Sequence, residues 1–302
     1  MSAGGATSAA EEADLIAGQA VFGCELIQQM GILLRLPQVA VSTAQVSFHR
    51  FYAKRSMRKF DVRVSSKFRV VAANYSSSGP CCTFFLDFSR SSPTRLRVVP
   101  SSLSPQYIAL GALFLATKVE ECPKKLRDVL QVFIYLEQKR QGVEKPTPVD
   151  IHSNRFSAYK DRLIRAEREL LKELGFVLYT EHPHKFILNY AKLLTLDDAT
   201  FKKLAQYAWN FINDSQRTDV CMRYPPETIC CAALWMGARV LQIKLPSSSE
   251  PPWWELFDAK REDMDAVCER VTALYSRPRA TFIDLYAQSQ QAAAAAPPPS
   301  GS

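Results

Sequence analysis

The stretch PQYIALGALFLATKV, residues 105–119, returns in similar form as PETICCAALWMGARV, residues 226–240. Both stretches are apolar around most of a helical circumference, so each is expected to form a helix that other helices enclose. Each begins with a proline, which suits the first helical turn because no N–H partner is needed there. At a constant offset of 121 residues, the matched pairs are Pro105 and Pro226, Ile108 and Ile229, Ala112 and Ala233, Leu113 and Leu234, Phe114 and Trp235, Lys118 and Arg239, and Val119 and Val240. The repeat predicts two small helical domains of one design.

Apolar spacing and capping residues predict further helices around these two. The expected ranges are 38–57, 123–140, 157–174, 183–194, 198–213 and 261–276. We therefore predict an all-α protein with a first domain over residues 21–179 and a second over residues 180–287. The ends, residues 1–20 and 288–302, are rich in Ala, Gly, Ser and Pro and are expected to be disordered.

The first repeat carries an insert. Gln45, Val46 and Phe48 resemble Gln206, Tyr207 and Trp209 at an offset of 161, which exceeds the offset of 121 by 40 residues. The extra residues fall within 64–106, a Ser-rich, basic stretch without sustained periodicity. Such a long irregular segment is unusual inside a compact domain. Three interpretations stay open: a disordered excursion, including translated non-coding sequence such as a retained intron; a loop that is phosphorylated or touches RNA; and a segment with a structural role.

The composition limits which classes of protein the chain can belong to. No apolar run reaches the 18–20 or so residues of a membrane span, and no secretory signal is expected. The eight cysteines include two adjacent pairs and no Cys-x-x-Cys spacing, which favours reduced thiols in the cytosol or nucleus. The net charge of +8 could suggest nucleic acid. However, residues 64–103 carry five of the basic residues against one acid, so half of the excess lies in the insert.

One pair of charges stands out on the predicted helices. Glu167 falls on the apolar stripe of helix 157–174, four residues after Leu163 and three before Leu170. A buried acid is costly unless it is paired. Lys118, the one charged residue between 107 and 119, is the candidate partner. The alternative is that Lys118 extends to solvent and Glu167 lies at the edge of the stripe.

Several segments resemble the cyclins of the transcription and splicing type, and most of all cyclin L in its plant form. The central ones are ATKVEE (116–121), CPKKLRDV (122–129), AERELLKELGF (166–176) and EHPHK (181–185). Further matches to cyclin L are GILLRLPQ (31–38), KFDV (59–62), NDSQRT (213–218) and PPWW (251–254). Together they cover about residues 20–63 and 107–280, which is nearly all of the chain that is expected to fold.

The resemblance implies two tandem cyclin boxes of five helices each, interrupted by the insert in the first box. It implies a regulatory subunit that is not itself an enzyme and that binds and activates a cyclin-dependent kinase in the nucleus. Lys118 and Glu167 would face the kinase together, with Glu121 as a further contact. Splicing factors are further expected partners, and no cofactor is expected. Cyclin L proteins also carry an Arg/Ser-rich tail, for which residues 288–302 offer no match.

Three other classes of function compete with this interpretation. An isoform with a damaged kinase groove would result if the insert frays the helix start at Tyr107. Catalysis or metal binding finds little support, because His182 and His184 lack further ligands nearby in sequence and Cys230 and Cys231 fall inside a core helix. A nucleic-acid-binding factor of the TFIIB type would share the doubled fold. Such factors usually carry a zinc ribbon, however, and the short basic run over residues 124–127 is expected to be a solvated face.

Overall fold

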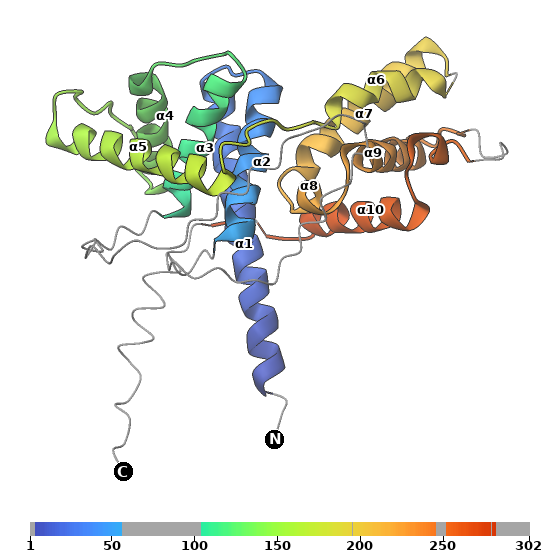
Figure 1. The fold of residues 1–302 in the computed structure, drawn as a ribbon, viewed down its shortest axis with the longest axis horizontal. Coiled ribbons are helices and arrows are strands. Elements are labelled where there is room, and N and C mark those ends of the chain that lie inside the picture. The colour runs from blue at the N-terminus through green and yellow to red at the C-terminus, as the bar shows by residue number, and fades with distance from the viewer. Residues whose placement is uncertain (1–3, 56–103, 195, 246–251, 279, 282–302) are drawn as a thin grey trace, which may run out of the picture.

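A computed structural model describes residues 4–55, 104–194, 196–245, 252–278 and 280–281 of the chain (Figure 1). These residues form helices and contain no β-strand, which confirms the all-α prediction. The elements are α1 (Gly4–Leu33), α2 (Gln38–Lys54), α3 (Pro105–Val119), α4 (Leu126–Arg140), α5 (Asn154–Leu174), α6 (His184–Leu193), α7 (Asp198–Ser215), α8 (Val220–Arg223), α9 (Pro226–Val240), η1 (Glu255–Phe257) and α10 (Arg261–Tyr275).

Helix α3 lies at the centre of the first bundle, with α1, α2, α4 and α5 packed around it. Its residues from Tyr107 to Thr117 are all buried, as the continuous apolar sequence predicted. Gly111 allows α5 to come close. A Cβ atom at this position would lie 3.0 Å from the Cβ of Ala166 and 3.1 Å from the backbone nitrogen of Glu167. The glycine therefore sets α5 against α3 at the level of Glu167.

Helix α9 has the same central place in the second bundle, where it packs on α6, α7 and α10. The bounds of α3 and α9 differ by 121 residues at both ends. Those of α2 and α7 differ by 160 and 161 residues. Between α9 and α10, the described chain has only the short η1, next to the buried Trp253. The second bundle thus repeats the first with a compact turn where the first has α4.

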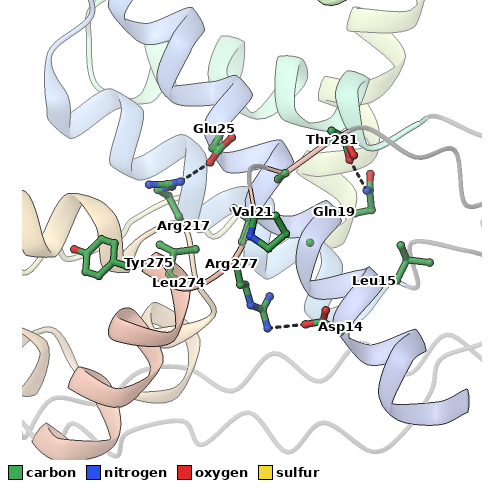
Figure 2. A pocket seen from close by; sticks show the side chains of 13 residues that line it. Asp14, Leu15, Gln19, Val21, Glu25, Arg217, Leu274, Tyr275, Arg277 and Thr281 are labelled. Carbon is green, nitrogen blue, oxygen red and sulfur yellow. Dashed lines mark hydrogen bonds and ion pairs between the residues drawn. The ribbon is translucent and has the colours of Figure 1, made fainter. Parts of the chain in front are cut away.

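Helix α1 differs from the predicted disordered tail over residues 1–20, since it is helical from Gly4 onward. The prediction rested on low apolar content, but alanine is the strongest helix former. Distant contacts also hold this helix (Figure 2). The Gln19 side-chain amide donates to the carbonyl of Thr281 at 3.0 Å, and Arg277 lies 2.9 Å from the Asp14 carboxylate. These partners lie more than 260 positions away in the sequence, so local composition could not reveal them.

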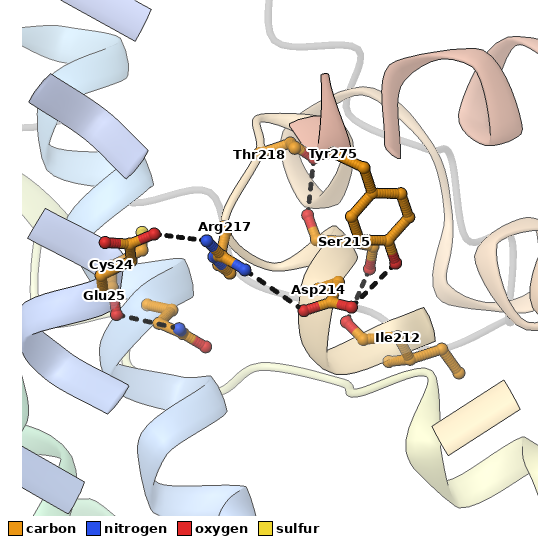
Figure 3. Close-up of polar contacts among 9 residues, drawn as sticks. Cys24, Glu25, Ile212, Asp214, Ser215, Arg217, Thr218 and Tyr275 are labelled. Atoms are coloured by element: carbon orange, nitrogen blue, oxygen red, sulfur yellow. Dashed lines mark hydrogen bonds and ion pairs between the residues drawn. The ribbon is translucent and has the colours of Figure 1, made fainter. Parts of the chain in front are cut away.

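The segment NDSQRT (213–218) forms the joint between the bundles (Figure 3). Arg217 donates to the carboxylate of Glu25 on α1, and its other terminal nitrogen lies 3.4 Å from the Asp214 carboxylate. The Tyr275 hydroxyl donates to the same Asp214 at 2.8 Å. Arg217 therefore connects α1 of the first bundle to α7 and α10 of the second.

Most of the insert, residues 64–103, and the end over 288–302 lie outside the described residues, so the predictions made for them stay predictions. The start of α3 is well formed. Tyr107 is buried, its backbone N–H donates to the carbonyl of Ser104, and its hydroxyl accepts a hydrogen bond from Arg162 at 2.8 Å. The damaged-groove alternative required a frayed helix start at Tyr107, and this start is intact in the structure.

Candidate functional site

The structure brings Lys118 and Glu167 together. The ammonium group of Lys118, in the last turn of α3, donates to Oε1 of Glu167 on α5 at 2.5 Å. The Lys118 side chain is 47% exposed and that of Glu167 is 13% exposed. The Lys118 nitrogen also lies 4.2 Å from the centre of the Phe114 ring. Both interpretations of the sequence are thus partly right, because the lysine reaches towards solvent and still pairs with the acid.

The charge pair contributes little to folding. An ion pair with one half-exposed partner is worth about 0–1 kcal/mol, because water screens it and both side chains lose freedom. Its position comes from backbone packing instead. Gly111 brings α5 against α3, and the buried Leu163 and Leu170 fix the rotation of α5, so that Glu167 lies beside the end of α3. An accessible cation and carboxylate on two rigid helices can together recognise a partner that offers the complementary pair.

Glu121 lies in the turn that ends α3, in a strained conformation. Its φ of 52° is in the left-handed region, where a side chain other than glycine costs about 1–2 kcal/mol. The N–H of Cys122 donates to the carbonyl of Thr117, and the N–H of Glu121 donates to the carbonyl of Lys118. This is the Schellman arrangement, which usually has glycine at the position of Glu121. The exposed carboxylate of Glu121 is therefore held in a fixed turn directly after the end of α3.

Comparison with known proteins identifies the family. No family model matches the chain. It is 38% identical to cyclin-L1-1 of Arabidopsis thaliana over 265 residues, which cover 88% of this chain and 52% of that protein. It is 37% identical to cyclin-L1 of Homo sapiens over 262 residues, or 87% of this chain and 40% of that protein. The chain is a cyclin of the L type. It spans about half or less of the length of these curated relatives.

A solved structure shares the cyclin fold of the chain. The crystal structure of the yeast RNA polymerase II CTD kinase CTDK-1 complex contains a chain that matches with a TM-score of 0.58 and 15% identity. The match covers 92% of this chain and 76% of that one. At this identity the likeness concerns the fold alone, and it agrees with the two helical bundles described above. The bundles are accordingly the two cyclin boxes.

An exposed apolar run follows the end of α5 and was not among the site residues predicted from the sequence. Phe176, Val177 and Tyr179 follow directly on α5 and are 69%, 66% and 76% exposed. Arg50 of α2 donates to the Tyr179 carbonyl at 3.2 Å and so fixes the backbone of this segment. The signal was present as the run FVLY after the predicted helix end at Gly175. This exposed apolar run is a second candidate contact surface on the first bundle.

The competing sites find no support among the described residues. No group of three or more His, Cys, Asp or Glu residues in that part of the chain could hold a metal ion. Burial raises the pKa of the Cys230 and Cys231 thiols, to about 12 for Cys231, so they are packing residues and not nucleophiles. Arg127 of the basic run pairs with Asp128 at 3.1 Å on an exposed surface. No described helix is long and apolar enough to cross a bilayer.

Proposed function

We propose that this cyclin is the regulatory subunit of a cyclin-dependent kinase and that Lys118, Glu121 and Glu167 of the first box bind the kinase. The observation that carries the proposal is the accessible charge pair of Lys118 and Glu167, which the packing of α3 and α5 holds in place and which folding itself scarcely needs. The exposed apolar run at Phe176 supplies the buried contact area that a stable complex requires.

The cyclin adds no catalytic group to the reaction. A kinase requires its own Lys–Glu ion pair and metal-binding Asp in place before phosphoryl transfer proceeds. A partner that binds this aligned state better than the unaligned one shifts the kinase population towards it. We further propose, from the type of cyclin, that the complex acts in the nucleus in transcription and pre-mRNA splicing, with splicing factors as additional partners. Imaging of the tagged chain together with a splicing-factor marker tests this placement.

The direct test is a charge exchange, Lys118→Glu with Glu167→Lys. The exchanged side chains still attract each other, so helical content by circular dichroism and thermal stability should stay close to wild type. Their charges now oppose those of the partner, so co-purification with the cyclin-dependent kinases of the source organism should be abolished. Activation of the isolated kinase on a peptide substrate should be lost as well.

Arg239→Glu in the second box is the matched control, because Arg239 corresponds to Lys118 in the repeat. It should leave kinase co-purification unchanged. Wild-type kinase binding by the exchanged Lys118 and Glu167 variant would overturn the assigned surface. Salt-dependent RNA or DNA binding by the wild-type chain, with no kinase recovered, would favour the TFIIB-type alternative.

A further inference from the structure

Three polar groups from different parts of the fold form a chain of hydrogen bonds behind the candidate surface. His182, just before α6, lies with its Nε2 atom 2.8 Å from the hydroxyl of Thr43 on α2. The Thr43 hydroxyl donates to Oε1 of Glu120 at 2.6 Å. Thr43 is 1% exposed and His182 is 8% exposed, so both are buried, and Glu120 is half-buried. His182 belongs to the second box, whereas Thr43 and Glu120 belong to the first.

The direction of these bonds follows from the donors available. Because the one hydrogen of the Thr43 hydroxyl goes to the Glu120 carboxylate, its oxygen accepts from an N–H at Nε2 of His182. His182 is then the neutral tautomer, with an unprotonated Nδ1 that has no hydrogen-bond partner among the described residues. Burial, with the neighbouring His184 and Arg50, lowers the pKa of His182 to about 4. Both hydrogen bonds that link the three side chains are therefore formed at neutral pH.

The chain of hydrogen bonds ends at the turn that carries the candidate kinase contacts. Glu120 is the residue that caps the C-terminal end of α3, between Lys118 and Glu121, and its N–H donates to the carbonyl of Ala116 at 2.9 Å. Its side chain points back to Thr43, whereas Lys118, two residues before it, and Glu121, directly after it, carry the exposed charges. The second repeat has no such anchor, because Leu241 stands 121 residues after Glu120 and Leu204 stands 161 residues after Thr43.

We propose that Thr43 and His182 are positioning residues for kinase binding: they hold Glu120 and so fix the turn that presents Lys118 and Glu121. The inference rests on the proposed function. It gives the His182-Pro183-His184 segment a role beyond that of a helix entry. His184 bonds Asn213 of α7 at 2.8 Å and secures α6 within the second box, while His182 connects this box to the kinase-facing turn. Correct docking of the second box is therefore needed for a well-ordered surface on the first.

The first experiment measures the turn without any kinase. Hydrogen exchange at the amides of Glu121 and Cys122 should be about tenfold faster in Thr43→Val, which removes the hydroxyl but keeps the volume. Thr43→Ser should keep the wild-type rate. Thr117→Val is the matched control, since among the described residues its buried hydroxyl bonds the Phe114 carbonyl of its own helix and no other group. If Thr43→Val fails to fold, Glu120→Leu, which copies the second repeat, should show the same faster exchange. Wild-type exchange in the folded variant overturns the proposal.

The second experiment measures affinity for a purified cyclin-dependent kinase that binds the wild-type chain. Thr43→Val should bind about tenfold more weakly, mainly through faster dissociation. In a Lys118→Ala, Glu121→Ala background the same change should have almost no further effect, because the positioned groups are gone. If the losses of affinity caused by Thr43→Val and by the two alanine substitutions simply add, the role of Thr43 is merely structural and the proposal is overturned. If no cyclin-dependent kinase that binds the wild-type chain is found, the proposed function is refuted, and the hydrogen-exchange experiment still tests whether Thr43 anchors the turn.

Discussion

The central helices of the two boxes end in the same way and yet present different chemistry. Gln242, 121 residues after Glu121, has a φ of 55°, and the N–H of Ile243 donates to the carbonyl of Ala238, as that of Cys122 does to Thr117. The same Schellman turn therefore ends α3 and α9. The repeat copied the backbone of this turn, and the two copies differ in the side chains placed on it.

The difference is clearest at the charge pair. The buried Leu163, Ala166 and Leu170 of α5 correspond to Met264, Val267 and Val271 of α10 at an offset of 101 residues. This offset places Cys268 at the position of Glu167. Cys268 is buried and its thiol donates to the Ala232 carbonyl at 3.7 Å. Burial raises the pKa of this thiol to about 11, and the opposing effect of Arg239 is small. The second box thus has a cation beside a thiol where the first has an ion pair. The duplicated fold explains the scaffold, and only the first copy has the candidate site.

The second helices of the boxes differ in burial. Eleven of the 17 residues of α2 are buried, against five of the 18 in α7. Helix α2 packs on α1, α3 and α5 and also on α8 of the second box, whereas α7 packs on α6, α9 and α10 alone among the strongly contacting pairs. Enclosure of α2 from both boxes explains how a residue on it can connect the two.

The largest expected effect compares equivalent aromatic residues. Phe48 is fully buried and its ring fills the space beside Gly23, so Phe48→Ala should lower the free energy of unfolding by about 3–5 kcal/mol. Trp209, at the matching position of α7, is 38% exposed. Trp209→Ala should cost only about 1 kcal/mol, through its contact with the His184 ring. Urea denaturation measures both, and equal costs would contradict the difference in enclosure.

The pH dependence of stability should reveal the buried histidines. Burial lowers the pKa of His49, His182 and His184, to about 4 for His182. The unfolded chain, with histidine pKa values near 6.5, then binds more protons than the folded chain between about pH 6.5 and 4. Stability should be complete above pH 6.5 and should fall through this range, by about 3 kcal/mol from His182 alone. The free energy of unfolding, measured by urea denaturation at several pH values, should change less steeply with pH in His182→Gln than in the wild type. An equally steep change would contradict the lowered pKa of His182.

The smallest effect concerns the two strained turns. Glu121→Gly and Gln242→Gly both relieve the left-handed conformation, and each should raise the free energy of unfolding by up to about 1 kcal/mol. Only Glu121→Gly should weaken kinase binding, because it also removes the exposed carboxylate. Thermal denaturation and kinase affinity, measured on both variants, separate the two contributions. Equal kinase affinity for both variants would remove Glu121 from the proposed surface.

The sequence predicted those features that rest on periodicity and capping. The repeated central helix and its proline start follow from spacing within a few turns. The spacing made Lys118 the candidate partner of Glu167 but left the unpaired alternative open, and the structure shows the pair. Helix α1 could not be predicted in the same way, since its contacts with Arg217 and Thr281 come from residues far along the chain. The turn at Glu121 could not be predicted either, because its left-handed position has a glutamate and not the glycine that is typical of such a turn.

The bond between Gln19 and the Thr281 carbonyl has a consequence for synthesis on the ribosome. The first box can complete its core once residues up to Leu174 have emerged. The contacts of α1 with Arg277 and Thr281 must wait longer, because these two residues are among the last of the described residues to be translated. At elongation rates of about 5–20 residues per second, this delay lasts on the order of ten seconds. A nascent chain that stalls in this interval carries a finished first box with an uncovered leading helix, a form that quality-control factors could distinguish from the completed protein.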